Sequence, residues 1–137
     1  MSAIEQLIRL HRWKLDEKRR RGADLERLAD RFRRDMEQLK AELRREQEAA
    51  ASSIELQRSL PGYASAIRNR CARLETSARE VESELEEVRE EIAEAYREMK
   101  RYEQALSSRE ARRQAVLRRR EQIASDEIGL SIYRRRQ

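Results

Sequence analysis

Apolar residues recur along this chain at alternating intervals of three and four, and this repeat constrains the fold more than any other feature. Such spacing is the seam of a coiled coil, in which one narrow apolar stripe on each helix packs against a partner helix. The sequence therefore predicts an all-α protein built from long helices. In the first half the two columns are Ile8, Leu15, Gly22, Ala29, Met36, Leu43, Ala50 and Ile4, His11, Lys18, Leu25, Phe32, Leu39, Glu46, Ser53. In the second half they are Cys71, Ala78, Leu85, Ile92, Met99, Leu106 and Ile67, Leu74, Val81, Val88, Ala95, Tyr102, followed by Val116, Ile123 and Leu130.

Composition leaves two readings, and the repeat chooses between them. Of the 137 residues, 43% are charged and only 4% are aromatic, which cannot build a broad globular core. A disordered polyelectrolyte or a set of long, narrow-seamed helices would both fit these values. The regularity of the columns favours the helices. Charged runs such as "REVESELEEVREE" then lie on the outer faces of the helices.

The only proline predicts where the chain turns back on itself. Pro61 and Gly62 would together cost about 4 kcal/mol inside a helix, and the seam fades nearby, where Glu46 and Ser53 occupy core columns. We therefore expect a single domain, residues 1–137, formed by two long helices in an antiparallel coiled-coil hairpin. Helix 1 is expected at about 2–58, the turn at 59–62, helix 2 at 63–126 and a tail at 127–137. One alternative stays open: because the register is continuous across the break, a kinked helix could instead pair with a second chain as a homodimeric rod.

Sites for catalysis or cofactors are not indicated by the sequence. It has no glycine-rich phosphate loop, no nucleophile elbow and no set of Cys and His residues able to bind zinc, so we expect a non-enzymatic protein without a metal or other cofactor. Cys71 lies in the seam as a small buried residue, and His11 as a half-buried polar spacer. No apolar run approaches the roughly 20 residues of a membrane span, and the first residues are unlike a signal peptide, so a cytoplasmic location is expected.

Charge is distributed unevenly along the chain. The formal net charge is +5, and cations gather in residues 1–22 and 109–137, whereas the middle of the chain is acidic. In a hairpin of equal arms the two basic ends would meet at one tip. That tip would offer a binding surface to an acidic partner. Nucleic acid is the weaker candidate partner, because these arginines alternate with acids and lack interleaved aromatic residues for base stacking.

The chain's only tryptophan lies on the outer side of the first helix. With the seam set by Ile4, Ile8 and His11, the side chains of Trp13 and Leu10 point away from the second helix. An exposed Trp beside Leu and arginines is typical of an interface anchor. Equally, Trp13 could rest against the apolar tail "IGLSIY". The predicted partner-binding residues are Arg9, Leu10, Arg12, Trp13, Lys14, Arg19, Arg20, Arg21, Arg112, Arg113, Arg118, Arg119 and Arg120.

Several segments together resemble the flagellar export protein FliJ family, and more distantly the YscO-type proteins of injectisomes. They are "LIRLHRWKLDEKRRR" opening a long helix, the aliphatic seam, "YASAIRNR" after the central break, and "ASDEIGLSIYRRR" at the close. The similarity extends over nearly the whole chain. The fold that this resemblance implies is an antiparallel hairpin similar to the central stalk of rotary ATP synthases.

The resemblance also implies a function, which is that of a component of the type III export apparatus at the cytoplasmic face of the inner membrane. Members of this family engage the hexameric export ATPase, contact the export gate membrane protein and handle export chaperones. The basic tip would then sit in the opening of the ATPase ring. Alternatives from other classes are a nucleic-acid-associated coiled coil, which would bind through the same arginines, and a homodimeric structural rod. A membrane-surface helix is the weakest alternative, because the apolar columns already face the seam.

Overall fold

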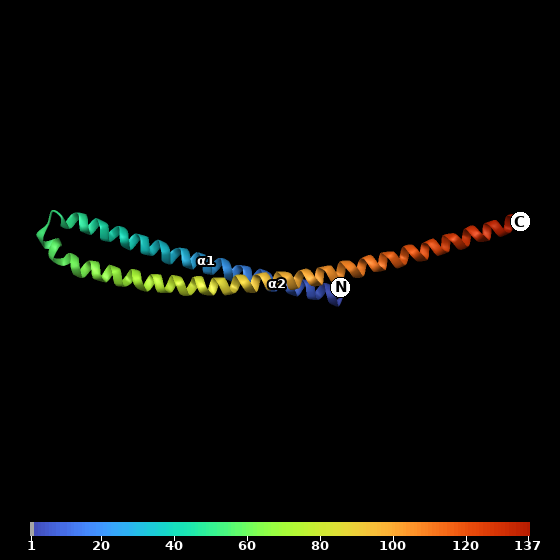
Figure 1. The fold of residues 1–137 in the computed structure, drawn as a ribbon, viewed down its shortest axis with the longest axis horizontal. Helices are drawn as coiled ribbons and strands as arrows, with labels where there is room; N and C mark the ends of the chain where they lie inside the picture. The colour runs from blue at the N-terminus through green and yellow to red at the C-terminus, as the bar shows by residue number, and fades with distance from the viewer. Residues whose placement is uncertain (1) are drawn as a thin grey trace. The chain divides into compact units, whose positions relative to one another are not determined.

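The structure is a computed structural model that describes residues 2–137, and it contains two α-helices packed against each other as a hairpin (Figure 1). Helix α1 spans Ala3–Ala50 and helix α2 spans Ile54–Arg136, with 48 and 83 residues. The predicted all-α helical hairpin is therefore confirmed. No helix among the described residues has a stretch both long and apolar enough to cross a membrane.

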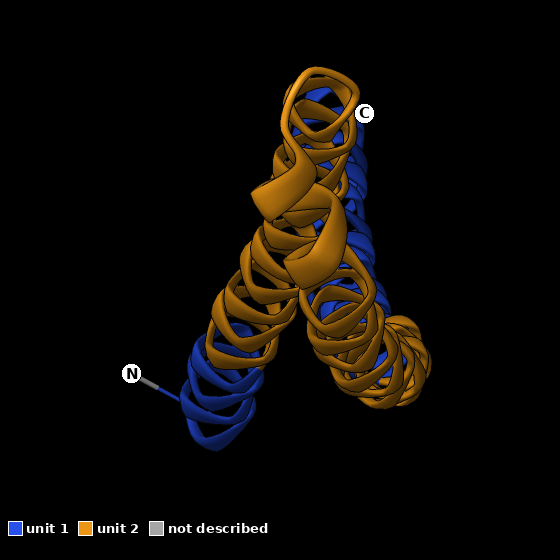
Figure 2. Cartoon of the chain, turned by 90° about the vertical axis from the view of Figure 1, so that its left-hand side faces the viewer, with its two compact units in different colours: residues 1–14, 95–137 blue, residues 15–94 orange. Residues whose placement is uncertain are grey.

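The chain divides into two compact units, which Figure 2 colours separately. One unit consists of residues 15–94 and contains the turn of the hairpin. The other consists of residues 1–14 with residues 95–137, so that α2 contributes to both units. Each unit is described below by itself.

Within residues 15–94 the predicted columns form the core. The buried residues come from the seam positions of both helices, which leaves charged side chains on the outer faces. Small residues alternate with large ones: Ala29 and Ala78 are buried in the same columns as Met36 and Leu85. Gly22 fits the same pattern, since it faces the side chain of Ile92. A seam with a small residue opposite a large one lets two helices pack closely without voids.

Gly22 leaves room for a larger side chain at its position in the seam. A Cβ atom built on Gly22 would lie 3.4 Å from Cδ1 of Ile92 and 3.6 Å from Cγ1 of Val88. These are ordinary van der Waals distances. The glycine is therefore not required for the close approach of the helices.

Gly22→Ala is expected to stabilise the hairpin by about 1 kcal/mol, because alanine lowers the entropy cost of the helix and its methyl group fits against Ile92. Urea unfolding followed by circular dichroism measures this change. Gly62→Ala is the control, because a Cβ there meets nothing within 4 Å and changes helix propensity alone. A loss of stability in Gly22→Ala would mean that the helices approach more closely than described.

The turn lies at residues 51–53, not at the predicted 59–62. Ser53 acts as the N-cap of α2, because its side-chain oxygen accepts a hydrogen bond from the backbone N–H of Leu56 at 3.4 Å. Glu55 follows in the first turn, where a negative charge is favourable. The hydroxyl of Ser52 in turn donates to the carbonyl of Ala49 at the end of α1. The pair of serines therefore provides the helix stop and start that we had assigned to the proline.

Pro61 lies inside α2, so the prediction that it breaks the helix was wrong. Proline there removes one hydrogen bond, the one to the carbonyl of Gln57. Both Pro61 and Gln57 are exposed, so water can hydrate the freed carbonyl. The first packed residue after this point is Ala64, which is buried. The cost of the proline is thus confined to the short run of α2 that precedes the seam.

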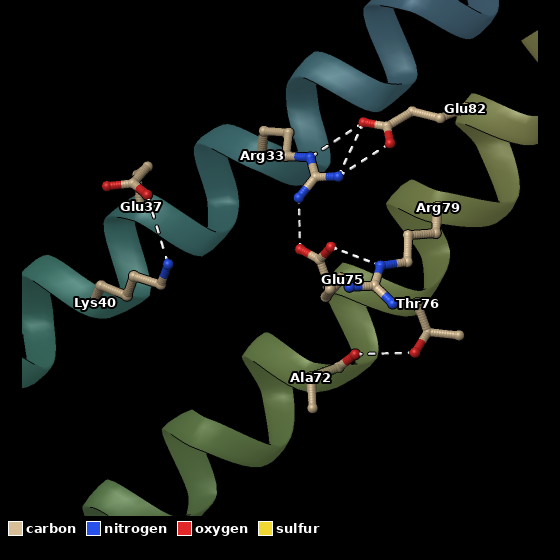
Figure 3. A network of polar contacts seen from close by, with 8 residues as sticks. All are labelled: Arg33, Glu37, Lys40, Ala72, Glu75, Thr76, Arg79 and Glu82. Carbon is tan, nitrogen blue, oxygen red and sulfur yellow. Dashed lines mark hydrogen bonds and ion pairs between the residues drawn. The ribbon is translucent and has the colours of Figure 1, made fainter.

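A network of charged side chains joins the two helices in the unit of residues 15–94 (Figure 3). Arg33 of α1 donates to both oxygens of Glu82 at 3.0 Å and to Glu75 at 2.5 Å. Arg79 donates to the other oxygen of Glu75 at 3.0 Å. The bond from Arg79, together with the nearby charge of Arg33, lowers the pKa of Glu75, and Glu82 raises the pKa of Arg33. The network fixes the register of the two helices more than it adds stability, because its members are largely solvent-accessible.

The lowered pKa of Glu75 predicts how its contribution to stability depends on pH. The folded protein binds the Glu75 proton less tightly than the unfolded chain does, so the contribution is present above the ordinary glutamate pKa of about 4.3. It is lost as the pH falls through the lower, folded pKa. Glu75→Gln should therefore melt below the wild type at pH 7, and the two melting temperatures should converge in strong acid. An unchanged difference at both pH values would contradict this prediction.

The last segment of α2 extends past the start of α1 (Figure 1). We call residues 107–136 the C-terminal extension; every one of them is exposed. The predicted tail at 127–137 is helical up to Arg136, with the cations of the last turn, Arg134 to Arg136, placed favourably at the helix C-terminus. Val116, Ile123 and Leu130, which we had placed in the core, are 50%, 50% and 55% exposed. They are not core residues because α1 has no residues left to cover them.

Candidate partner-binding surface

The first turns of α1 carry an exposed apolar pair. Trp13 is 61% exposed and Leu10 45%, and the basic residues Arg9 and Lys14 beside them are exposed as well. We call these four residues the Trp13 face. Their positions follow from the seam, because Ile8 is buried against the second helix and turns the other side of α1 outward. The outward orientation of Trp13 and Leu10 is as predicted.

Behind the Trp13 face, a short row of contacts holds α1 against α2. The rings of His11 and Tyr102 stack with centroids 4.8 Å apart. Beside them, Arg12 Nη2 donates to Glu103 Oε1 at 3.0 Å, and Lys100 Nζ donates to Glu103 Oε2 at 3.0 Å. Lys100 first, and then Arg12, lower the pKa of Glu103. These contacts orient the first turns of α1, and with them the Trp13 face.

Sequence reasoning missed Glu103 and Lys100, because a residue on one helix does not identify its neighbour on the other. The Lys100 ammonium also lies 5.5 Å from the centre of the ring of Tyr96, a partly exposed residue four positions earlier on α2. The spacing of these residues along α2 is three or four, which was the only signal available. Arg12 was predicted to dock a partner; the structure places it in an intramolecular ion pair with Glu103 and leaves its side chain 62% exposed.

The predicted basic residues of the other unit are also partly engaged. Arg21 pairs with Glu84 across the helices, and Arg20 pairs with Glu17 on its own helix at 2.9 Å. Lys18 lies 3.6 Å from Glu91. Among residues 2–137, Arg19 forms no ion pair. Arg19 and Arg20 thus remain exposed for a partner, whereas Arg21 would have to break its ion pair with Glu84 to bind one.

The C-terminal extension carries the remaining predicted residues, and it does not gather them at one tip. Arg113 pairs with Glu110 at 3.6 Å, and within the described chain Arg112 and the three arginines 118–120 form no ion pair. Continuing the pairing of His11 with Tyr102 places Ala3 opposite Glu110. Arginines 118–120 therefore lie more than two helical turns past the start of α1. The predicted meeting of both basic ends was wrong for them, because the early turn makes α1 much shorter than α2.

The alternative in which the tail covers Trp13 does not agree with the structure. Trp13 and the tail residues Ile128, Leu130 and Tyr133 are all more than half exposed. A groove near the start of α1 is lined by two apolar residues, Ile8 and Leu106, and by the charged residues Glu5, Arg9, Arg12 and Glu103. The accessible features of this unit are thus the Trp13 face, this groove and the basic extension.

The described side chains offer no metal centre: residues 2–137 contain no group of three or more His, Cys, Asp or Glu side chains able to hold an ion. Cys71 is a free thiol and only partly buried, although its column predicted burial. No protein-family model matches the chain, and no curated protein or solved structure with significant similarity was found. What the arrangement supports chemically is binding through apolar contact and positive charge.

Proposed function

We propose that this protein is a non-enzymatic component of the flagellar type III export apparatus, in which it acts as a stalk-like coiled coil. It engages the hexameric export ATPase and the export gate membrane protein at the cytoplasmic face of the inner membrane, and it escorts export chaperones. The resemblance of its sequence segments to the FliJ family suggested this role. An injectisome stalk of the YscO type has the same physical requirements and is the nearest alternative.

The observation that carries the proposal is the combination of a helical hairpin with a basic extension of a single helix. The extension bears nine arginines and four acids between residues 109 and 136. A single helix about 10 Å across can enter the opening of a protein ring, where a hairpin would be wider. Arginine side chains that are not paired within the chain can then meet acidic side chains of the ring. The Trp13 face provides an apolar anchor next to this element of the same unit.

The test mixes the full-length protein with the purified export ATPase of the same organism, and follows ATP hydrolysis and ring assembly as the protein is added. Stimulation of hydrolysis, or assembly of the ring at lower ATPase concentration, is the expected result. No change in either would contradict the stalk role. Because the ATPase carries the nucleotide chemistry, this protein alone should show no hydrolysis.

A second candidate function is nucleic-acid binding, which the unpaired arginines of the extension favour. Each arginine that neutralises a phosphate releases counterions, so affinity would fall steeply with salt. Titration of the protein into labelled duplex and single-stranded DNA at two salt concentrations separates the candidates. Binding that persists at physiological salt supports this second function, and binding seen only at low salt reflects general electrostatic attraction.

A further inference from the structure

The apolar column of the C-terminal extension continues a seam that is already occupied. Tyr102 packs against His11 of α1, and the same column passes through Arg109 and then goes on in steps of seven through Val116, Ile123 and Leu130. These three side chains are half exposed, and no other segment of the unit covers them (Figure 1). The extension thus presents one side of a helix–helix interface, and no helix of the unit covers it.

The existing contacts between α1 and α2 define how such a partner would be placed. His11 and Tyr102 occupy the same position of the seven-residue repeat, and so do Arg21 and Glu84. Gly22 and Ile92 likewise share a position. In this antiparallel seam, residues therefore face others whose numbers differ by a multiple of seven. The same rule can be applied to the extension.

We propose that the C-terminal extension pairs with the same extension of a second copy of this chain, antiparallel and in the register of the hairpin. Ile123 then faces Ile123 of the second copy across a two-fold axis. Val116 faces Leu130 of the second copy, and Leu130 faces its Val116. This inference does not rest on the proposed role in export, and it competes with that role for the same segment, because a paired extension is two helices wide and only the unpaired chain presents the single helix that enters a ring.

Charge complementarity selects a second copy as the occupant. A two-fold interface must be self-complementary, so cations on one side of the axis need acids at a matching distance on the other side. Arg119 and Arg120 precede Ile123 by four and three residues, and Asp126 and Glu127 follow it by three and four. Arg119 and Asp126 share a repeat position beside the seam, so Arg119 faces Asp126 of the second copy in this register. Arg120 faces Glu127, so opposite charges meet four times in the pair, against two meetings of like charge where Arg113 faces Arg134 of the second copy.

The Arg120 and Glu127 pair occupies the core column and has a consequence for specificity. A charged pair in a coiled-coil seam adds little stability, but a parallel arrangement in register places Arg120 opposite Arg120 and Glu127 opposite Glu127. The polar pair thus favours the antiparallel arrangement over the parallel one. It also explains why the seam has two apolar columns in the hairpin and only one in the extension.

The space beside the extension matches the length of the second helix. Ala3, the first residue of α1, lies opposite Glu110 in the hairpin register. With Ile123 on the axis, Arg136 of the second copy also falls opposite Glu110. The second extension therefore ends where α1 begins. It continues the seam of α1 for about 40 Å.

Sedimentation equilibrium of the full-length protein tests this pairing. Only three apolar layers are buried, so the dimer should be concentration-dependent, with the mean mass rising from 16.4 kDa toward twice that value. Ile123→Asp should remain at 16.4 kDa throughout, because it places two carboxylates on the axis. A wild-type mass of 16.4 kDa at every concentration, or a dimer that survives Ile123→Asp, would overturn the proposal.

A charge exchange tests the register. Arg119→Glu should weaken the dimer several-fold, because the introduced carboxylate meets Asp126 of the other copy at both ends of the pair, and adding Asp126→Arg should restore it. Arg118→Glu is the matched control, since Arg118 lies on the outer face and should leave the mass unchanged. A double variant as weak as Arg119→Glu, or an equal effect of Arg118→Glu, would exclude this register.

Cysteine crosslinking tests the orientation on a Cys71→Ser background. Ile123→Cys should form a disulfide-linked dimer under mild oxidation, because the residue faces itself in the second copy. Val116→Cys should not, because it faces Leu130. Crosslinking of both variants would indicate a parallel pair, and crosslinking of neither would contradict contact at the axis; either result rejects the proposal.

Discussion

Met36→Ala is expected to destabilise the hairpin by about 2–5 kcal/mol, the largest effect of any single truncation proposed for this chain. Met36 is 5% exposed. In the register set by Gly22 and Ile92 it lies opposite Ala78, which is fully buried and too small to fill the space that the side chain would leave. A two-helix seam has no second layer that can collapse into the cavity. Urea unfolding followed by circular dichroism measures the loss.

The size-exchange variant makes this prediction specific to the register. Met36→Ala combined with Ala78→Met restores the total volume of the layer, so it should recover most of the stability that Met36→Ala loses. Leu28→Ala is the matched control, since Leu28 is a large side chain of α1 that is 38% exposed and should lose far less on truncation. If the effects of Met36→Ala and Ala78→Met on the free energy of unfolding simply add, Met36 and Ala78 do not share a layer.

The seam itself was predictable because it depends only on local periodicity. Residues seven apart lie on one side of a helix, so Leu15, Ala29 and Met36 had to be buried together once α1 formed. Outward positions follow from the same geometry, which is why the exposure of Trp13 could be predicted.

The turn could not be predicted from the same information. The prediction rested on the penalty of about 3 kcal/mol that Pro61 carries inside a helix. It did not consider the pair of serines, which can cap helix ends. However, Pro61 is exposed, and its lost hydrogen bond lies before the packed part of α2, so the penalty falls where water can reduce it. The caps formed by Ser52 and Ser53 decided the position.

That error then displaced the predicted basic tip. Moving the turn toward the N-terminus shortens α1, and Val116, Ile123 and Leu130 consequently lose their partner helix. Periodicity indicates that a residue faces another helix, but it does not indicate whether that helix belongs to the same chain or to a second one. The unmatched part of the column is therefore where a second molecule should be sought.

The exposure of the candidate binding residues was predictable, whereas their contacts were not. Arg9, Leu10 and Trp13 are exposed as expected, whereas Arg12 is engaged by Glu103 and Arg21 by Glu84. Cross-helix ion pairs depend on the register between helices, which a single sequence leaves open. Net charge alone therefore overstates how many arginines are available to a partner. The arginines without an ion pair across the helices are the better choice for mutation.

Loss of ATPase stimulation is the other large effect that we expect. Arg9, Arg20 and Arg118 are exposed, lie outside the seam and form no ion pair across the helices. Changing all three to glutamate should abolish stimulation of the export ATPase, because attraction to acidic side chains of the ring becomes repulsion at each position. Helicity should be unchanged, since no seam residue or helix cap is altered. Hydrolysis assays over a range of protein concentrations measure the loss.

The control for this variant separates docking from net charge. Arg31, Arg44 and Arg45 are exposed residues of α1 outside the seam, and replacing them by glutamate changes the net charge by the same amount. That variant should stimulate as the wild type does; equal loss in both would show that general charge, not the predicted residues, attracts the ATPase.

Trp13→Ala completes the comparison, because it removes the apolar anchor at constant charge and should raise the concentration needed for half-maximal stimulation. Retained stimulation in the Arg9, Arg20 and Arg118 variant would reject the electrostatic docking of these residues. Because none of the three takes part in the dimer contacts, that outcome would leave the pairing of the extensions intact.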